Sequence, residues 1–222
     1  VEQISIDLFL IFYLRGLLSG LDGTREASLP FDKTRNGFVM SEGSYVVILE
    51  ELQHALDRGA HIYAEITGFG NTFVGGKKHP EDVRVRRVEK AMHDALDNTE
   101  VKKEDIDFIS ANANGCKMQD KVEAKAIQSY FGTGSSQIPV SAIKSNVGES
   151  YGASGAAQII STVMSINTGL IPHIINHSNK DPEINLNLII DKPLKKEIQN
   201  AIINNMDYDG NNSCLVVSKY NK

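Results

Sequence analysis

Residues 30–43 read Pro30-Phe31-Asp32-Lys33-Thr34-Arg35-Asn36-Gly37-Phe38-Val39-Met40-Ser41-Glu42-Gly43. A polar loop, residues 20–28, precedes this stretch, and the apolar run Val46-Val47-Ile48-Leu49 follows it. A continuous apolar run of this length predicts a strand that is buried on both faces. Residues 50–58 then predict a short helix, closed by Gly59. The stretch therefore leads into an alternation of strand and helix.

The alternation continues to the end of the chain. Apolar residues at every second position predict strands, and apolar residues three and four apart predict helices. The expected strands cover residues 62–66, 107–111, 138–143 and 213–218, and the expected helices cover residues 85–96, 121–131 and 152–167. Strands that alternate with helices indicate a layered α/β fold.

Residues 6–17, near the start, have helical spacing of apolar side chains. Nothing before this stripe could cover it, so we expect a cover from outside these residues. The stripe is interrupted by Asp7 and Arg15 and is too short to span a bilayer, and it lacks the features of a secretory signal. A helix that is buried or lies at an interface is the better interpretation.

Composition limits the class of protein. The 222 residues are 41% hydrophobic and 23% charged, which is typical of one or two globular domains. A net charge of -5, with scattered lysines and arginines, argues against nucleic acid or a membrane surface as a partner. Cys116 and Cys214 have no metal-ligand spacing and form no disulfide framework. We therefore expect no metal site, a cytoplasmic location, and proteins or small molecules as partners.

Residues 30–43 resemble the PFDxxRDGFVxGEG segment of the β-ketoacyl-acyl-carrier-protein synthases, and the similarity extends over nearly the whole chain. The resemblance implies a thiolase-like α/β fold, in which two similar halves each hold a mixed five-stranded sheet layered with helices and the protein forms a dimer. Members are roughly twice this length, so residues 1–59 would end the first half and residues 60–222 would form the second. The nucleophilic cysteine of the family would lie earlier, and neither Cys116 nor Cys214 matches it.

The resemblance also implies two histidines that polarise the thioester carbonyl of the malonyl unit as it loses carbon dioxide. The first belongs to a motif NAHGTSTxxND, and we assign its position to Asn112. The second belongs to KSxxGHxxGAAGA, and Glu149 stands in its place. An asparagine amide can still donate a hydrogen bond to an oxyanion. An ionised glutamate cannot, and losing one such donor typically costs about 3–4 kcal/mol.

Other family positions are retained or changed. Lys144 and Glu123 match the active-site lysine and its nearby acid, and we expect both to be structural, with Lys144 as a possible ion-pair partner of Glu149. The GFGGxN loop that lines the acyl entrance becomes Asp207-Tyr208-Asp209-Gly210-Asn211-Asn212. Two glycines have become aspartates, so the prediction is a loop that has lost its gating role but still presents the Tyr208 ring.

Three interpretations remain open. The first is a non-catalytic subunit of the chain-length-factor kind, which pairs with an active ketosynthase and shapes the tunnel of a type II polyketide, polyene or fatty-acid-like system. The second is a divergent condensing enzyme or acyltransferase that uses an upstream cysteine with Asn112 and Glu149. The third is one half of a split protein that depends on a separate N-terminal half. In each case no dissociable cofactor is expected, and the substrates would arrive on the phosphopantetheine arm of an acyl carrier protein.

Overall fold

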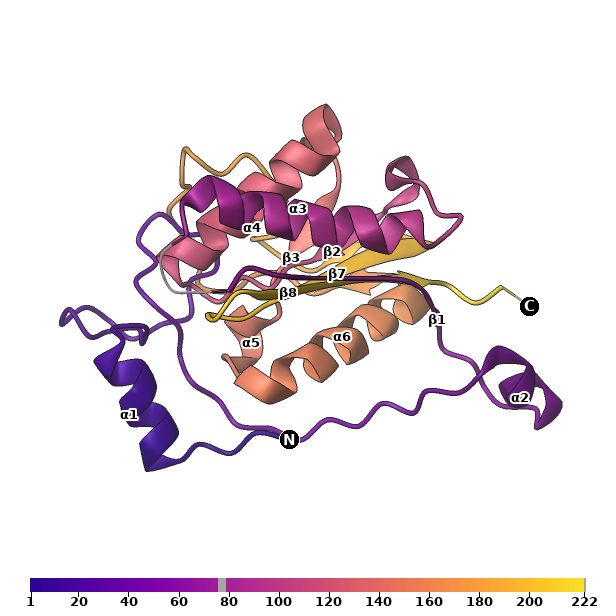
Figure 1. Cartoon of the computed structure of the whole chain (residues 1–222), viewed down its shortest axis with the longest axis horizontal. Helices are drawn as coiled ribbons and strands as arrows, with labels where there is room; N and C mark the ends of the chain where they lie inside the picture. Colours follow the sequence, from indigo (N-terminus) through magenta and orange to yellow (C-terminus); the bar gives the residue numbers. More distant parts are fainter. Residues whose placement is uncertain (76–78, 222) are drawn as a thin grey trace.

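The computed structural model describes residues 1–75 and 79–221. A mixed sheet of six strands in the order β1-β8-β7-β2-β3-β5 forms its centre (Figure 1). The strands are β1 (Glu65–Phe73), β8 (Asn211–Ser218), β7 (Asn200–Met206), β2 (Phe108–Ser110), β3 (Pro139–Ser141) and β5 (Asn187–Leu188). The first three are antiparallel neighbours, and β7, β2, β3 and β5 run parallel. The expected mixed sheet is confirmed, with the two-residue β5 as a sixth strand.

Helices cover both faces of this sheet. α3 (Glu81–Asp97) and α4 (Lys117–Phe131) lie on one face, and α6 (Ser154–Thr168) lies on the other (Figure 1). The short helices are α5 (Lys144–Val147) and three 3-10 turns, Lys103–Asp105, Gly132–Ser136 and Tyr151–Ala153. A two-stranded sheet pairs β4 (Leu170–Ile171) with β6 (Leu194–Lys195). This is the layered α/β architecture that the alternation predicts.

Contact between α3 and β1 depends on two glycines. A Cβ atom at Gly68 would lie 2.1 Å from the carbonyl oxygen of Ala95, and one at Gly70 would lie 2.0 Å from that of Ala91. Any side chain at either position would therefore force the helix away from the strand. The expected strand at residues 62–66 is wrong at both ends, because β1 pairs with β8 only from Glu65 and continues through the two glycines to Phe73.

The core on the α3 and α4 face also holds part of residues 30–43, which we call the PFD segment. Phe31 is fully buried in the same cluster as Met92 of α3 and Ile202 of β7. The Asp32 carboxylate accepts hydrogen bonds from the backbone N–H groups of Ser178 and Asn179, at 2.8 and 2.7 Å. Residues 30–43 are thereby fastened to the body of the molecule.

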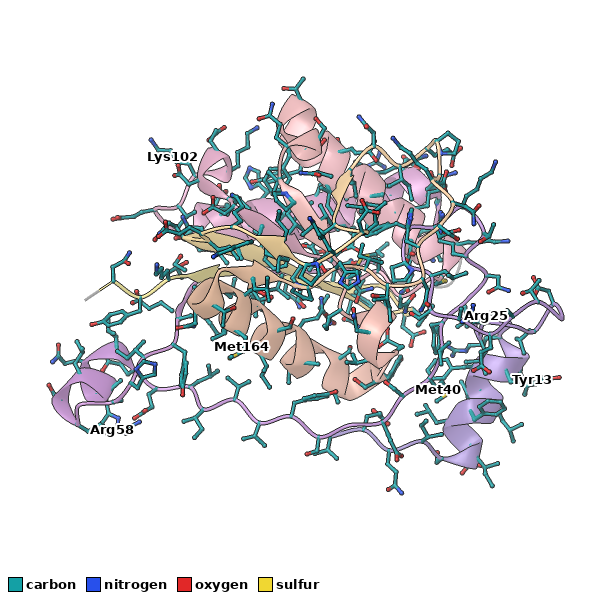
Figure 2. The ribbon with its side chains drawn as sticks, turned by 180° about the vertical axis from the view of Figure 1, so that it is seen from behind. Tyr13, Arg25, Met40, Arg58, Lys102 and Met164 are labelled. Atoms are coloured by element: carbon teal, nitrogen blue, oxygen red, sulfur yellow. The ribbon has the colours of Figure 1, made fainter. Side chains whose placement is uncertain are left out.

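Two segments lie away from this body. The expected buried strand at residues 46–49 is wrong: Val46 and Ile48 are 79% and 81% exposed, and no strand is assigned there among the described residues. A strand needs a neighbouring backbone to pair with, and this extended segment runs past the outer side of α6, away from the sheet (Figures 1 and 2). The helix after it, α2 (Leu52–Asp57), is capped by the Glu51 side chain.

The second segment that lies away from the body is α1 (Ile6–Leu14), which ends before the predicted limit at residue 17. Phe12 is its buried side chain, whereas Ile6 and Leu14 are 79% and 80% exposed. Tyr13 points away from the molecule (Figure 2). Most of the apolar stripe thus remains uncovered. In the described parts of the chain, no helix is both long and apolar enough to cross a bilayer.

Candidate functional site

The candidate site lies beyond the carboxyl ends of three neighbouring parallel strands. Asn112 and Asn114 follow β2, Lys144 and Glu149 follow β3 through α5, and Tyr208 follows β7. Side chains from adjacent parallel strands meet at this edge because their carboxyl ends point the same way, which is where α/β proteins place their sites. The topology therefore gathers residues that are almost one hundred positions apart.

A buried ion pair forms the centre of this site. The Lys144 ammonium lies 2.8 Å from a carboxylate oxygen of Glu149, and the two side chains are 2% and 5% exposed. Lys144 also donates to the Asn112 carbonyl oxygen at 2.8 Å. The second Glu149 oxygen accepts the backbone N–H of Tyr151 at 2.9 Å. The expected pairing of Glu149 with Lys144 is confirmed.

Asn114, to which the family motifs assign no role, touches Glu149 directly. Its amide nitrogen donates to Glu149 at 2.8 Å and lies 3.2 Å from the Tyr208 hydroxyl. Asn112 instead faces Lys144 and the backbone N–H of Met206. Asn112 lies eight residues before Asp120, which is the spacing between the histidine and the final aspartate of NAHGTSTxxND, whereas Asn114 lies six residues before Asp120. The assignment of the first histidine's position to Asn112 therefore stays a prediction, and Asn114 lies two residues after it.

Glu149 is held in place by the PFD segment. Its backbone N–H donates to the Val39 carbonyl at 2.8 Å, and its carbonyl accepts from the Ser41 N–H at 3.0 Å. Gly148 precedes it with φ +76°, and a Cβ there would lie 2.8 Å from the Ser41 Cβ. Only a glycine fits this left-handed position without strain. Residues 30–43 therefore position the carboxylate that pairs with Lys144.

Two buried carboxylates of α4 support the loop that carries Asn112 and Asn114. The Glu123 oxygens accept the backbone N–H groups of Asn112 and Ala113, at 2.8 and 2.9 Å. Asp120 accepts the N–H groups of Phe31 and Asn114, at 2.8 and 3.1 Å. No direct ion pair joins Lys144 to Glu123 among the described residues, and Glu123 supports the loop instead, in the structural role expected for it.

These carboxylates give a pH prediction. Burial raises the pKa of Asp120 from 3.8 to about 6 and that of Glu123 from 4.5 to about 7. The folded state therefore binds protons that the unfolded state has released, and stability falls as pH rises from about 4 to 7. Each shift corresponds to roughly 3 kcal/mol. We expect the free energy of unfolding, from chemical denaturation, to be higher at pH 5 than at pH 7.

Glu123→Gln tests the cause of this slope. The variant lacks one titrating group, so its stability should depend less on pH between 5 and 7 than that of the unchanged protein, whatever its absolute stability. Asp32 is an internal check because its pKa shifts in the opposite direction. Burial raises the pKa of Asp32, but hydrogen bonds from Thr34, Asn179 and Ser178 outweigh burial and lower this pKa to about 2. Its contribution is lost only below about pH 4. An equal slope in both proteins would contradict the assignment.

The loop of residues 207–212 is closed by its own first side chain. One Asp207 oxygen accepts the backbone N–H groups of Asp209, Gly210 and Asn211, at 2.9, 2.7 and 2.8 Å. The Gly210 carbonyl accepts the Val74 N–H at 2.9 Å, which ties the loop to the end of β1. Asp207 thus stiffens a turn that the family builds from glycine.

Aromatic rings surround Tyr208. Its ring centroid lies 6.2 Å from that of Phe12 and 5.7 Å from that of Phe38, and Phe12 in turn lies 5.1 Å from Tyr151. Burial raises the pKa of Tyr208, so the phenol stays protonated. Burial also raises the pKa of the neighbouring Cys116 thiol, which makes it a poor nucleophile at neutral pH. In residues 1–75 and 79–221 no cluster of three or more His, Cys, Asp or Glu side chains has the arrangement of a metal site.

The fold and these motifs together define a ketosynthase-like protein. Residues 63–178 match the family "Beta-ketoacyl synthase, C-terminal domain". The chain therefore belongs to the β-ketoacyl synthase family.

Curated relatives agree. A putative polyketide beta-ketoacyl synthase 1 of Streptomyces cyaneus is 39% identical over 171 residues, which are 76% of this chain and 40% of that protein. The 3-oxoacyl-[acyl-carrier-protein] synthase 2 of Coxiella burnetii is 33% identical over 206 residues, covering 93% of this chain and 50% of that protein. The chain spans about half the length of the curated relatives it matches.

Solved structures are also similar. The ishigamide ketosynthase/chain length factor has a TM-score of 0.89 at 32% identity and covers 99% of this chain and 52% of its own. A complex described as a type II PKS acyl-carrier protein with its ketosynthase bound to the hexaketide has a TM-score of 0.92 at 27% identity, over 99% of this chain and 55% of its own. The thiolase-like fold expected from the sequence is confirmed.

Proposed function

We propose that this chain belongs to a non-catalytic, ketosynthase-like subunit of the chain-length-factor kind. It pairs with an active ketosynthase in the cytoplasm and shapes the acyl tunnel of a type II polyketide, polyene or fatty-acid-like system. The observation that carries this proposal is the buried ion pair between Lys144 and Glu149.

The ion pair leaves the decarboxylation step without the donor of the second histidine's position. In the second histidine's position, Glu149 offers only acceptor oxygens, which repel a developing enolate. The Lys144 ammonium is already bound by Glu149 and by the Asn112 carbonyl. The Asn114 amide also donates to Glu149. The hydrogen-bonding groups of Lys144 and Glu149 are thus bound to protein groups rather than offered to a substrate.

The exposed apolar surfaces support an N-terminal half as a further partner. They comprise the stripe of α1, the segment 46–49 and the outer face of α6, where Ile160 and Met164 are 36% and 49% exposed. Exposed apolar surface of this extent marks an interface. In this proposal residues 1–59 complete the first half of the fold and residues 60–222 form the second. The segment 46–49 would then become a strand of the first half, with backbone partners supplied by preceding residues.

The acyl chain in this proposal is carried by the phosphopantetheine arm of an acyl carrier protein. The related structures support these partners, since one is named as a ketosynthase/chain length factor and another holds an acyl carrier protein with its ketosynthase. The chain itself then needs no dissociable cofactor.

Co-expression tests the pairing. We expect affinity purification through a tag on this protein alone to recover an equimolar amount of a ketosynthase encoded beside it. Condensation of malonyl units should need both subunits. The control is the same ketosynthase expressed without this protein, which should yield little or no full-length product. Failure to form a stable heterodimer, with full activity of either subunit alone, would contradict the proposal.

The second candidate function is a divergent condensing enzyme or acyltransferase that uses an upstream cysteine. One observation favours it: the Asn112 amide nitrogen is buried without a hydrogen-bond partner and could donate to an oxyanion. The test is acylation of the purified protein by a carrier thioester, followed by chain extension. Extension that is lost in Glu149→Ala would support the enzyme and reject the non-catalytic subunit.

A further inference from the structure

The three departures from the family motifs form one hydrogen-bonded unit. Asn114 stands at the first threonine of the NAHGTST stretch, Glu149 holds the second histidine's position, and Tyr208 lies in the altered entrance loop. The Asn114 amide bridges the other two, at 2.8 Å from the Glu149 carboxylate and 3.2 Å from the Tyr208 hydroxyl. Its carbonyl oxygen accepts the Cys116 N–H at 3.0 Å, which fixes the amide orientation. Side chains that change independently after loss of activity have no reason to bond to one another in this way.

Packing adds to the hydrogen bonds. The Tyr208 ring lies against Phe12 and Phe38, both of which are nearly fully buried at 2% and 1% exposed. The loop that carries Tyr208 is stiffened by Asp207, whose carboxylate accepts three successive backbone N–H groups. The Tyr208 ring is therefore held in place by its aromatic neighbours, by its own loop and by the buried polar site below it.

We propose that Asn114 is a positioning residue that fastens Tyr208 over the Lys144 and Glu149 pair, making the loop of residues 207–212 a fixed wall that excludes carrier-borne thioesters from this subunit's own site. The wall leaves the acyl chain to the partner's active site. This inference rests on the proposed non-catalytic function, but it concerns access to the site, which can be measured without any activity.

Cys116 provides the measurement. Its side chain is buried, and burial raises the pKa of its thiol, which the Tyr208 hydroxyl partly offsets. Cys214 is fully buried in β8 and reports on opening of the whole domain. The experiment compares the rates at which a pantetheine-sized iodoacetamide modifies the two thiols of the intact protein, followed by peptide mass spectrometry.

Two variants test the fastening. Asn114→Ala removes the two hydrogen bonds that the amide nitrogen donates and the one that its oxygen accepts from the Cys116 N–H. Tyr208→Phe removes the hydroxyl but keeps the ring. We expect modification of Cys116 to become about tenfold faster in each variant, because opening of the loop of residues 207–212 costs less free energy when these hydrogen bonds are absent. Cys214 should stay protected. Loss of the Tyr208 hydroxyl alone would raise the Cys116 pKa and slow the reaction, so a faster reaction reports opening rather than altered thiol chemistry. Asn185→Ala, at an exposed asparagine, should leave both rates unchanged.

The outcomes are distinguishable. An unchanged rate of Cys116 modification in Tyr208→Phe would contradict the proposal that the loop is a fixed wall. An equal increase in the modification rates of Cys116 and Cys214 in Asn114→Ala would contradict it as well. Rapid modification of Cys116 in the unchanged protein would do the same. None of these results bears on whether the subunit pairs with a ketosynthase, which the co-expression experiment measures.

Discussion

Lys144→Met is expected to lower the free energy of unfolding by about 3–5 kcal/mol, since it leaves the Glu149 carboxylate buried without its cation. The remaining partners of Glu149 would be the Asn114 amide and the Tyr151 N–H. Neither carries a charge that could offset the cost of keeping an ionised carboxylate out of water. Chemical denaturation of the intact protein at pH 7 measures the loss.

A matched exposed pair provides the control. Lys90 lies 2.8 Å from Asp94, the same separation as Lys144 from Glu149, but the two side chains are 56% and 30% exposed. Lys90→Met should cost less than about 1 kcal/mol because water screens such a pair. The double variant Lys144→Met with Glu149→Gln should recover much of the loss. Equal effects of Lys144→Met and Lys90→Met would contradict the account of a buried pair.

Arg35→Met is expected to have an effect of similar size, about 3–5 kcal/mol, because it removes the cation from a second buried network. The Arg35 guanidinium donates to Asp181 at 2.6 Å and to the Asp32 carbonyl at 2.8 Å, and lies 3.9 Å from Asp120. Asp120 is fully buried and supports Phe31 and the loop of Asn114. Loss of Arg35 therefore loosens the PFD segment and the site together.

Two further variants isolate this cause. Arg35→Lys keeps the charge but not the planar fork, so it should recover only part of the stability. Arg86→Met removes an arginine from an exposed pair with Asp82, where both side chains are 63% exposed, and should cost less than about 1 kcal/mol. Denaturation midpoints at pH 7 compare the three. A loss for Arg35→Met no larger than that for Arg86→Met would contradict the role given to the network.

The sequence predicted the layered fold and the motif that carries Glu149, because both depend on local patterns. It missed β7, since the asparagines of Asn200–Met206 are typical of turns rather than of strands. Asn204 is nonetheless 1% exposed in that central strand, so tertiary pairing overrides the local preference. The opposite error occurred at residues 46–49, where apolar pattern alone could not supply the backbone partners that a strand needs.

The site shows the same division. The pairing of Lys144 with Glu149 could be anticipated because both residues belong to one short motif. The role of Asn114 could not, because its two partners are 35 and 94 positions away and meet it only through the order of β7, β2 and β3.

In the proposed function, this subunit contributes no active site of its own. The most direct measurement uses the co-expressed pair with the ketosynthase's nucleophilic cysteine replaced by alanine, and it follows chain extension from malonyl units on the carrier protein. The account predicts that all extension is lost, although the heterodimer still forms. Extension that persists in this pair and disappears when Glu149→Ala is added would contradict it.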